Sequence, residues 1–304
     1  MTEHRDAVLA LAETARRNDG VSPLSEAFLL DLASDHPRST HLVTEVDGEV
    51  VGYAQVDPVG STELVVHPAH RHTGVARALW GRSLDAGART LWAHGDLPAS
   101  TRFAHGLGLT KVRELHRMER PLREGDLAPV EFPPGFRTRT FRPGDDDEAW
   151  VALNAAAFAE HREQGRLTLD DLHERMSQSW FDTEGFFLVE DEQAPDAGPV
   201  AFHWTKVPEM GAGLGWAHGG GGEERARSVG EVYVVGVHPA YQGRGLARPL
   251  TRLGTHHLAG LGLTKVELYV DGDNSSALST YRREGFTSAA VDAMYAAEPA
   301  PADG

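Results

Sequence analysis

The fold is decided by the stretch Glu231-Val-Tyr-Val-Val-Gly-Val-His-Pro-Ala-Tyr-Gln-Gly-Arg-Gly-Leu-Ala247. Its valines are typical of a buried strand, and Gly236 among them indicates a bulge or the close approach of another backbone or a ligand. The strand ends at His238-Pro239, because proline has no N–H to donate to a ladder. The glycine-rich residues that follow open a helix near Gly245. The stretch therefore predicts a strand, a loop and a helix in that order.

A glycine-rich loop at the start of a helix binds phosphate for two reasons. Residues without side chains let the backbone come close, and the unpaired N–H groups of the first helical turn carry partial positive charge. A single Gly-x-Gly is also compatible with an ordinary turn. The pattern here is more specific, because a valine strand precedes Gln242-x-x-Gly245-x-Ala247 and the chain has no Walker lysine and no Gly-x-Gly-x-x-Gly fingerprint at this loop. These residues resemble the acetyl-CoA loop of the GCN5-related N-acetyltransferases, the GNAT family.

Length and composition limit the possible classes of protein. The chain has 304 residues, which suggests about two domains, and 40% hydrophobic with 24% charged residues is typical of a globular protein. Its formal charge of −16 argues against a nucleic-acid partner. The lack of cysteine excludes disulfides and thiolate metal sites, and the 16 histidines show no metal-ligand spacing, so we expect no metal. Without a membrane span or signal peptide in the sequence, we expect a cytoplasmic monomer that does not bind membranes.

Residue patterns predict two similar series of elements. In the first half we expect helices over residues 6–17, 22–32, 71–84 and 99–105, and strands over 41–46, 49–56, 63–68, 91–93 and 112–118. In the second half we expect strands over 136–141, 186–190, 200–207, 231–237, 265–270 and 289–295, and helices over 146–159, 169–178 and 275–283 and from Gly245 onward. Asp47-Gly48 predicts a hairpin turn, and residues 210–230 predict a glycine-rich surface loop.

The two series form a repeat. Val66-His-Pro68 and Arg71-x-x-Gly74-x-Ala76 match Val237-His-Pro239 and Gln242-x-x-Gly245-x-Ala247 at a constant offset. The GNAT resemblance therefore implies an α/β (α+β) fold of two tandem modules, each a mixed, mostly antiparallel sheet flanked by helices. We expect an N-terminal module over residues 1–120, a proline-rich linker over 121–135 and a C-terminal module over 136–298.

The resemblance implies that acetyl-CoA is bound at two matching sets of residues. The loop amides would hold its pyrophosphate, and the strand would hold its pantetheine arm and thioester. The set in the second half is Val235, Gly236, Val237, Gln242, Gly243, Arg244, Gly245, Leu246, Ala247, Arg248, Asn274, Ser275, Ser276, Ala277, Leu278 and Ser279. The set in the first half is Leu64, Val65, Val66, His72, Thr73, Gly74, Val75, Ala76 and Arg77.

Two residues of the second half are candidates for catalysis. Acetyl transfer to an amine needs a group that accepts the amine's proton and one that protonates the departing thiolate. Glu231 stands at the start of the strand as a candidate base, and Tyr281 matches the tyrosine that protonates the coenzyme A sulfur in the family. The alternative interpretations are a solvated glutamate and a tyrosine that only packs. We favour catalysis because two family positions are filled in the same half.

The same overlay places no reactive side chain in the first half. Gly60 falls opposite Glu231, and Ala104 falls opposite Tyr281. Leu97 takes the place of Asn274, the asparagine that contacts the cofactor in the family. The first module is therefore predicted to bind acetyl-CoA without catalysis, and the second module is predicted to catalyse.

Five further segments narrow the resemblance to tandem members of the family that acetylate the cysteinyl amine of cysteinyl-glucosaminyl-inositol. These segments are Glu63-Leu-Val-Val-His-Pro68, Trp92-Ala-His-Gly95, Asn154-Ala-Ala-Ala-Phe158, Phe202-His-Trp-Thr-Lys-Val207 and Gly230-Glu-Val-Tyr-Val234. The resemblance implies that the acceptor amine is bound by Glu26, Glu163, Lys206, Glu231 and Tyr269. An acetyltransferase for another small-molecule or protein amine and a non-catalytic coenzyme A sensor remain alternatives; Glu231 and Tyr281 argue against the sensor.

Overall fold

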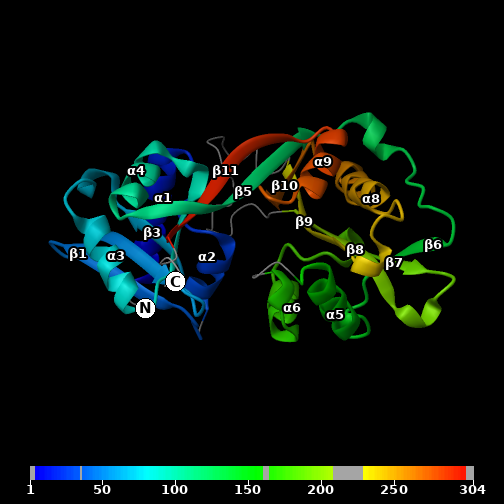
Figure 1. Ribbon diagram of the computed structural model, residues 1–304, viewed down its shortest axis with the longest axis horizontal. Coiled ribbons are helices and arrows are strands. Elements are labelled where there is room, and N and C mark those ends of the chain that lie inside the picture. Colours follow the sequence, from blue (N-terminus) through cyan, green and yellow to red (C-terminus); the bar gives the residue numbers. More distant parts are fainter. Residues whose placement is uncertain (1–3, 35, 160–163, 208–228, 299–304) are drawn as a thin grey trace, which may run out of the picture.

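Eleven strands pair in one continuous sheet, in the order β1-β2-β3-β4-β11-β5-β10-β9-β8-β7-β6. The computed structural model describes residues 4–34, 36–159, 164–207 and 229–298. Figure 1 shows that the sheet runs through two lobes, with the first half of the chain in one and most of the second half in the other. Only β3 with β4 and β9 with β10 are parallel, and every other neighbouring pair is antiparallel. The sheet is therefore mixed and mostly antiparallel, as predicted.

The first half contains the predicted elements, although the helix predicted from Arg71 begins only at Val75, because His72 and Gly74 have positive φ angles and belong to a loop. The elements are α1 (Arg5–Asp19), α2 (Glu26–Ala33), β1 (Thr40–Val46), β2 (Glu49–Val56), β3 (Ser61–Val66), α3 (Val75–Asp85), β4 (Thr90–Ala93), α4 (Pro98–Gly106) and β5 (Leu109–Pro121). Asp47 and Gly48 have φ angles of 52° and 81°, so the predicted hairpin turn is confirmed. The predicted start of α2 is wrong: the Ser22 hydroxyl donates to the Leu24 carbonyl at 2.8 Å, and the helix begins only at Glu26, behind Ser25.

The second half repeats this series. Its elements are β6 (Phe136–Thr140), α5 (Asp147–Ala157), α6 (Leu169–Met176), β7 (Phe186–Asp191), β8 (Pro199–Lys206), β9 (Val229–Val237), α8 (Ala247–Gly260), β10 (Lys265–Asp271), α9 (Ser275–Arg283) and β11 (Thr287–Ala297). Most of the predicted glycine-rich loop over 210–230 lies outside the described residues; its last residue, Gly230, belongs to β9.

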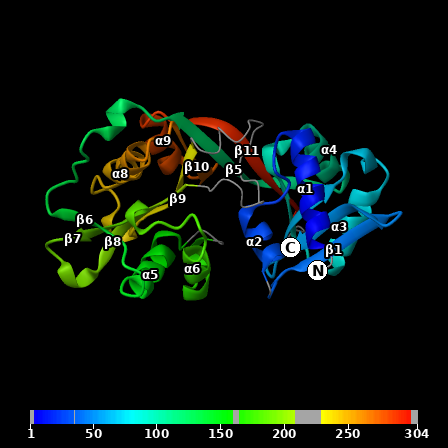
Figure 2. The ribbon, with the colours of Figure 1, turned by 180° about the vertical axis from the view of Figure 1, so that it is seen from behind.

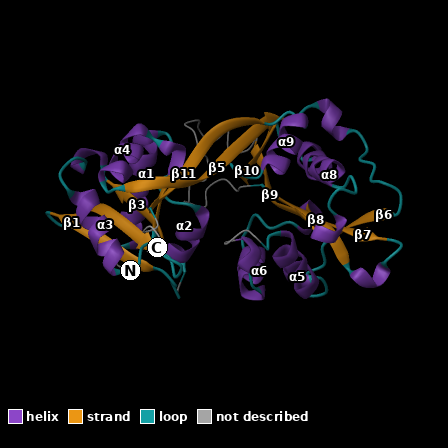
Figure 3. Cartoon of the chain, in the orientation of Figure 1, coloured by secondary structure: helices purple, strands orange, loops and turns teal. Residues whose placement is uncertain are grey.

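The two halves exchange their last strands. β11 ends the chain but lies between β4 and β5, and β5 ends the first half but lies between β11 and β10. β5 and β11 pair with each other from Thr287↔Glu119 to Ala297↔Leu109. Figures 2 and 3 show both strands passing from one lobe to the other. The strand exchange joins the lobes through backbone hydrogen bonds, while the division at residues 120 and 136 stays a prediction.

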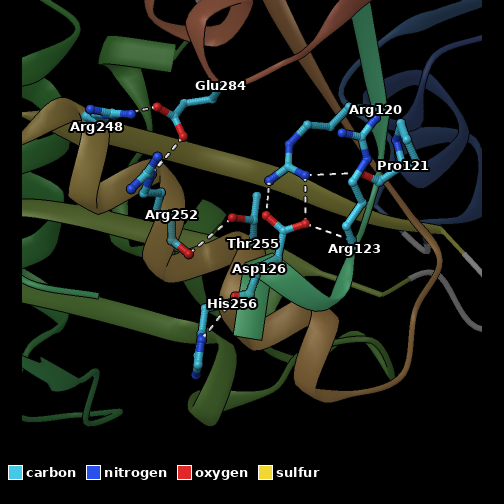
Figure 4. A network of polar contacts seen from close by, with 9 residues as sticks. All are labelled: Arg120, Pro121, Arg123, Asp126, Arg248, Arg252, Thr255, His256 and Glu284. Atoms are coloured by element: carbon cyan, nitrogen blue, oxygen red, sulfur yellow. Dashed lines mark hydrogen bonds and ion pairs between the residues drawn. The ribbon is translucent and has the colours of Figure 1, made fainter. Parts of the chain in front are cut away.

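The linker is folded by ion pairs of its own and contacts α8 through a backbone carbonyl. The Asp126 carboxylate, in a short helical turn of the linker, accepts two hydrogen bonds from Arg120 at 2.7 and 2.8 Å and one from the Arg123 amide. The Asp126 carbonyl in turn accepts from His256 on α8 at 3.1 Å (Figure 4). The linker therefore covers one side of the helix that carries the glycine-rich loop.

A second set of ion pairs joins α8 to the end of α9. The Glu284 carboxylate accepts from Arg248 at 2.7 Å and from Arg252 at 2.8 Å, and its side chain is only 6% exposed (Figure 4). Arg248 and Arg252 lie four residues apart and so share one face of the helix. These pairs hold the start of α8 close to the turn that follows α9.

A glycine of α8 should prove necessary for this packing. A Cβ on Gly254 would overlap the buried ring of His203 on β8, which donates to the Leu250 carbonyl at 2.8 Å, whereas a Cβ on Gly260 would meet nothing within 4 Å. Gly254→Ala should therefore lower the free energy of unfolding by roughly 1–3 kcal/mol. Gly260→Ala on the same helix should leave it unchanged or raise it by up to about 1 kcal/mol. Urea unfolding measures both, and equal stabilities would contradict the packing described.

Candidate functional site

The site is built on β9, whose first residues lie between two other strands. Glu231 is the register partner of Lys206 on β8 and of Glu267 on β10. These three side chains are therefore neighbours across the sheet, which the sequence alone did not show. Beyond Val232 and Leu268 the pairing of β9 with β10 ends, although β9 continues to Val237. The two parallel strands thus diverge beyond Glu231.

The bulge in β9 lies at Tyr233 and not at Gly236. The pairing with β8 shifts between Trp204 and Thr205, which leaves Tyr233 as the extra residue. Glycine occupies position 236 for a different reason: a Cβ there would lie 2.7 Å from the Phe202 ring. The predicted close approach is thus made in this structure by an aromatic side chain.

The bulge turns two successive side chains to the same side of the sheet. Tyr233 and Val234 both pack in the aromatic cluster around Trp150, while Val232 and Val235 both pack on the opposite side, where α8 lies. In a regular strand neighbouring side chains would alternate. The bulge therefore places the Tyr233 ring beside the end of β8.

Lys206 joins the two lobes. Its side chain is 2% exposed, and its Nζ lies 2.5 Å from Oε1 of Glu26, the first residue of α2, and 4.0 Å from Oε2 of Glu231. The ammonium group also lies 4.8 Å from the Trp180 ring centre and 5.2 Å from the Tyr233 ring centre. Figure 1 shows α2 on the side of its lobe that faces β9 and α6. We call Glu26, Trp180, Lys206, Glu231 and Tyr233 the inter-lobe cluster.

Burial and neighbouring charges make Glu231 an unusual carboxyl group. Its pKa is raised to about 8, chiefly by burial; Lys206 opposes this shift, and Glu26 and Glu267 add to it. A carboxyl group with such a pKa can exchange protons close to neutral pH. The inter-lobe cluster therefore contains a proton acceptor, a fixed positive charge and a second carboxylate.

Tyr269 lies on β10 beside the same group of charges. It is the register partner of Arg117 on β5, which pairs with Glu267 at 3.0 Å. Burial raises the pKa of Tyr269 well above its usual value, and Glu267 and Glu231 add to the effect, so the hydroxyl stays protonated. Glu163, the remaining predicted acceptor residue, lies outside the described residues.

The glycine-rich loop has the geometry of an anion site. Gly243 and Gly245 have φ angles of 76° and 82°, which only glycine adopts easily, and α8 begins at Ala247 without a side-chain cap. The first helical hydrogen bond of α8 runs from the Leu250 amide to the Leu246 carbonyl. The amides of the preceding turn therefore have no acceptor within the helix and are available to a ligand.

Tyr281 and Asn274 lie on α9. Tyr281 packs in the same core cluster as Val232, the neighbour of Glu231, and burial raises its pKa to about 12. The Asn274 side chain accepts from the Ala277 amide at 3.0 Å and so caps the helix. The structure thus brings Tyr281 close to β9 and gives Asn274 a structural role; their predicted contacts with acetyl-CoA stay predictions.

The first half has the same loop with different contacts. His67 and His238 both accept from the second amide after them, and His72 and Gly74 have φ angles of 63° and 94°, as the glycines have in the second loop. Arg71 is held by Asp19 at 2.6 and 2.7 Å. The predicted repeat is therefore visible in the backbone geometry of the two loops, while phosphate binding by them stays a prediction.

The first half has no room for a side chain at Gly60, the position that matches Glu231. A Cβ on Gly60 would lie 2.7 Å from the Gly87 carbonyl, and the φ of Gly60 is 89°. Ala104 is fully buried, and Leu97 precedes α4 without a side-chain cap. No carboxylate could replace Gly60 without local rearrangement, and the difference in catalysis between the halves stays a prediction.

Sequence patterns alone did not identify the residues around Lys206. Trp180 and Tyr233 form the faces of its site, and Arg175 donates to the Tyr233 hydroxyl at 3.1 Å.

Within the ranges that the structure describes, no cluster of His, Asp or Glu side chains is arranged to hold a metal ion. Across those same residues no helix has the length and hydrophobicity needed to cross a bilayer.

Comparisons with known proteins agree with this geometry. The sequence profile of the acetyltransferase (GNAT) family matches residues 7–108 and 150–286. A mycothiol acetyltransferase of Thermobispora bispora is 48% identical over 297 residues, covering 96% of this chain and 95% of that protein. One of Streptomyces coelicolor is 46% identical over 305 residues, covering 97% and 92%. The two segments matched by the profile confirm the predicted tandem repeat.

Solved structures support the fold. A GCN5-related N-acetyltransferase from Sphaerobacter thermophilus has a TM-score of 0.67 at 23% identity, covering 97% of this chain and 92% of that one. A tandem GNAT protein from the clavulanic acid biosynthesis pathway has a TM-score of 0.67 at 17% identity, covering 99% and 97%. These similarities confirm the predicted tandem fold.

Proposed function

We propose that this chain, which belongs to the acetyltransferase (GNAT) family and within it to the mycothiol acetyltransferases, transfers acetyl from acetyl-CoA to the cysteinyl amine of cysteinyl-glucosaminyl-inositol. The product is mycothiol. The observation that carries the proposal is Glu231, whose side chain is 14% exposed and lies beside Lys206 where β9 and β10 diverge. A base near the start of β9, with an anion-binding loop after the end of the same strand, suits transfer from a long anionic acyl carrier to an amine.

The second half contains the residues that would hold acetyl-CoA, which supplies the activated acetyl group. The amides from Gly243 to Arg248 would bind the pyrophosphate, because they begin α8 without a side-chain cap. The backbone of Val235 and Val237 would bind the pantetheine arm, since β9 there has left β10. The left-handed glycines fit this role, because side chains at those positions would approach the phosphates.

Glu231 is suited to accept the proton of the acceptor amine. An α-amino group has a pKa of about 8, and the pKa of Glu231 is raised to about 8 by burial. A proton can therefore pass between the two groups at little cost in free energy.

Tyr281 is suited to donate to the departing sulfur. With a pKa raised to about 12 by burial, its hydroxyl carries its proton throughout the neutral range. It packs in the core cluster that contains Val232 of β9. A base and a hydroxyl donor on neighbouring elements distinguish this half from a protein that only senses coenzyme A.

We assign the first half a binding role without catalysis. Its loop repeats the backbone geometry of the second loop, whereas Gly60, Ala104 and Leu97 offer no reactive group. Glu26 of the first half nevertheless reaches the site of the second half. The two modules would therefore contribute to one reaction.

The proposed function is tested by assaying acetyl transfer from acetyl-CoA to a panel of amines. The cysteinyl pseudodisaccharide should be acetylated most efficiently, followed by cysteine amide, and an amine without the cysteinyl group should react least. Mass spectrometry of the products identifies the acetylated nitrogen. Preference for an unrelated amine would show that another acetyltransferase activity is correct, and no transfer to any amine would favour the coenzyme A sensor.

The pH dependence of turnover tests the role of Glu231. Because the base must be deprotonated, kcat/KM for the amine should rise as the pH increases through about 8, after correction for the amine's own titration. Glu231→Gln should remove this rise and lower turnover by roughly a hundredfold. Glu267→Gln should shift the rise to lower pH, because Glu267 raises the pKa of Glu231. An unchanged profile in Glu231→Gln would exclude this residue as the base.

Two glycine variants test the acetyl-CoA loop. Gly245 and Gly262 have φ angles of 82° and 78° and lie at opposite ends of α8, so a side chain strains the backbone equally at both. Gly245→Glu should abolish coenzyme A binding to the second half, because it places a negative charge where the pyrophosphate would lie. Gly262→Glu should leave binding intact. Calorimetry with coenzyme A, in protein whose first loop carries Gly74→Glu, measures this site alone; equal affinities would refute the assignment.

A further inference from the structure

A buried histidine in the first lobe joins two motifs that the proposed reaction does not use. His94, from Trp-Ala-His-Gly95, has its Nε2 3.1 Å from the carboxylate of Glu63, from Glu-Leu-Val-Val-His-Pro68. Its Nδ1 lies 3.1 Å from the carboxylate of Asp292 on β11. The side chains are 2% exposed for Glu63, 9% for His94 and 8% for Asp292. We call these three residues the His94 cluster.

The His94 cluster carries charge in the interior. Burial alone would lower the pKa of His94, but Glu63 and Asp292 outweigh it and raise the pKa to about 10. The Gly95 amide also donates to Asp292 at 2.6 Å. Buried ion pairs contribute little net stability compared with apolar packing, because both charges lose their water. A role in holding neighbouring residues in place therefore explains the cluster better than a gain in stability does.

Glu63 connects the His94 cluster to α2. Its second carboxylate oxygen accepts from the Ser25 amide at 2.7 Å, and Ser25 is the residue that precedes α2. The next residue, Glu26, pairs with Lys206 of the other lobe at 2.5 Å. An unbroken series of contacts therefore leads from Asp292 on β11 to Lys206.

The far end of α2 is held independently. Asp31 accepts from the Gln55 side chain at 3.0 Å and from the Arg38 amide at 2.7 Å. These bonds fix the last turn of the helix and do not involve the His94 cluster. Among polar contacts, the residue before the first turn, which carries Glu26, is held by Glu63, and Glu63 is held by the histidine.

We propose that the His94 cluster is a positioning device for the acceptor site: it holds the first turn of α2 so that Glu26 meets Lys206 across the lobes. Its effect on catalysis rests on the proposed function, whereas its effect on Lys206 does not. His94 touches no reacting group of the proposed acetyl transfer. Removing its charge would release Glu63, loosen the start of α2 and weaken the contact between Glu26 and Lys206.

The first test needs no substrate. The chain has only three lysines, Lys111, Lys206 and Lys265, so ¹⁵N-lysine labelling gives three side-chain ammonium signals. Glu26→Gln should shift the Lys206 signal and speed its exchange with water, and His94→Gln should shift it in the same direction. Lys265 pairs with Glu119 and serves as the internal reference. A Lys206 signal unchanged by His94→Gln would overturn the proposal.

Tyr295→Phe is the matched control. Tyr295 also lies buried on β11, but its hydroxyl donates to Asp96 at 2.7 Å, and Asp96 pairs with Lys111. This variant should shift the Lys111 signal and leave Lys206 unchanged. If His94→Gln does not fold, Asp292→Asn removes the other charge that faces His94 and should shift Lys206 in its place. A shift of Lys206 in Tyr295→Phe equal to that in His94→Gln would mean general loosening and would also overturn the proposal.

The second test uses kinetics on the active protein. His94→Gln should raise KM for the cysteinyl amine by roughly tenfold, as expected for losing one charged contact, and leave KM for acetyl-CoA nearly unchanged. The same substitution should have little further effect when Glu26 is already glutamine, because both act through one contact. Additive effects would overturn the proposal. If the wild-type protein acetylates no cysteinyl amine, the proposed function fails, and the lysine signals alone decide the role of the His94 cluster.

Discussion

The structure depends on one buried lysine whose charge must be balanced from both halves of the chain. Lys206 is 2% exposed, and an unpaired ammonium group in such a place would cost several kcal/mol. Glu26 comes from the first lobe and Glu231 from the second, while Trp180 and Tyr233 close the faces. The relative position of the lobes is thereby part of the chemistry, because moving one lobe removes a carboxylate from the site.

The strand exchange gives this arrangement a rigid support. β5 and β11 pair with each other and with the other half's sheet, so the two lobes are joined by backbone hydrogen bonds in addition to side chains. Asp292 reaches His94 because β11 lies beside β4. A first half without a base of its own thus still contributes to the reaction, through α2 and through the neighbours that hold it.

Much of the fold could be predicted from the sequence, because hydrophobic periodicity, Asp47-Gly48 and the glycine-rich loops act locally. Contacts between distant residues could not: Asp292 and His94 are 198 residues apart, and no local pattern states which strand will pair with β4. The bulge lies at Tyr233 and not at the predicted Gly236, because glycine at position 236 makes room for the nearby Phe202 ring. Glu26 and Lys206 were identified only through the family resemblance, Glu231 also through its place at the start of the strand, and no sequence pattern indicated Trp180.

The central claim is that Glu26 of one lobe and Lys206 of the other are in direct contact. Carbodiimide coupling measures this most directly, because it joins a carboxylate and an amine only when the two touch. Tryptic digestion and mass spectrometry of the treated protein should show the Glu26 peptide linked to the Lys206 peptide. The link between Lys111 and Asp96, which are 2.6 Å apart within the first half, serves as the positive control. Formation of that control link while Lys206 stays uncoupled to Glu26 would contradict the account.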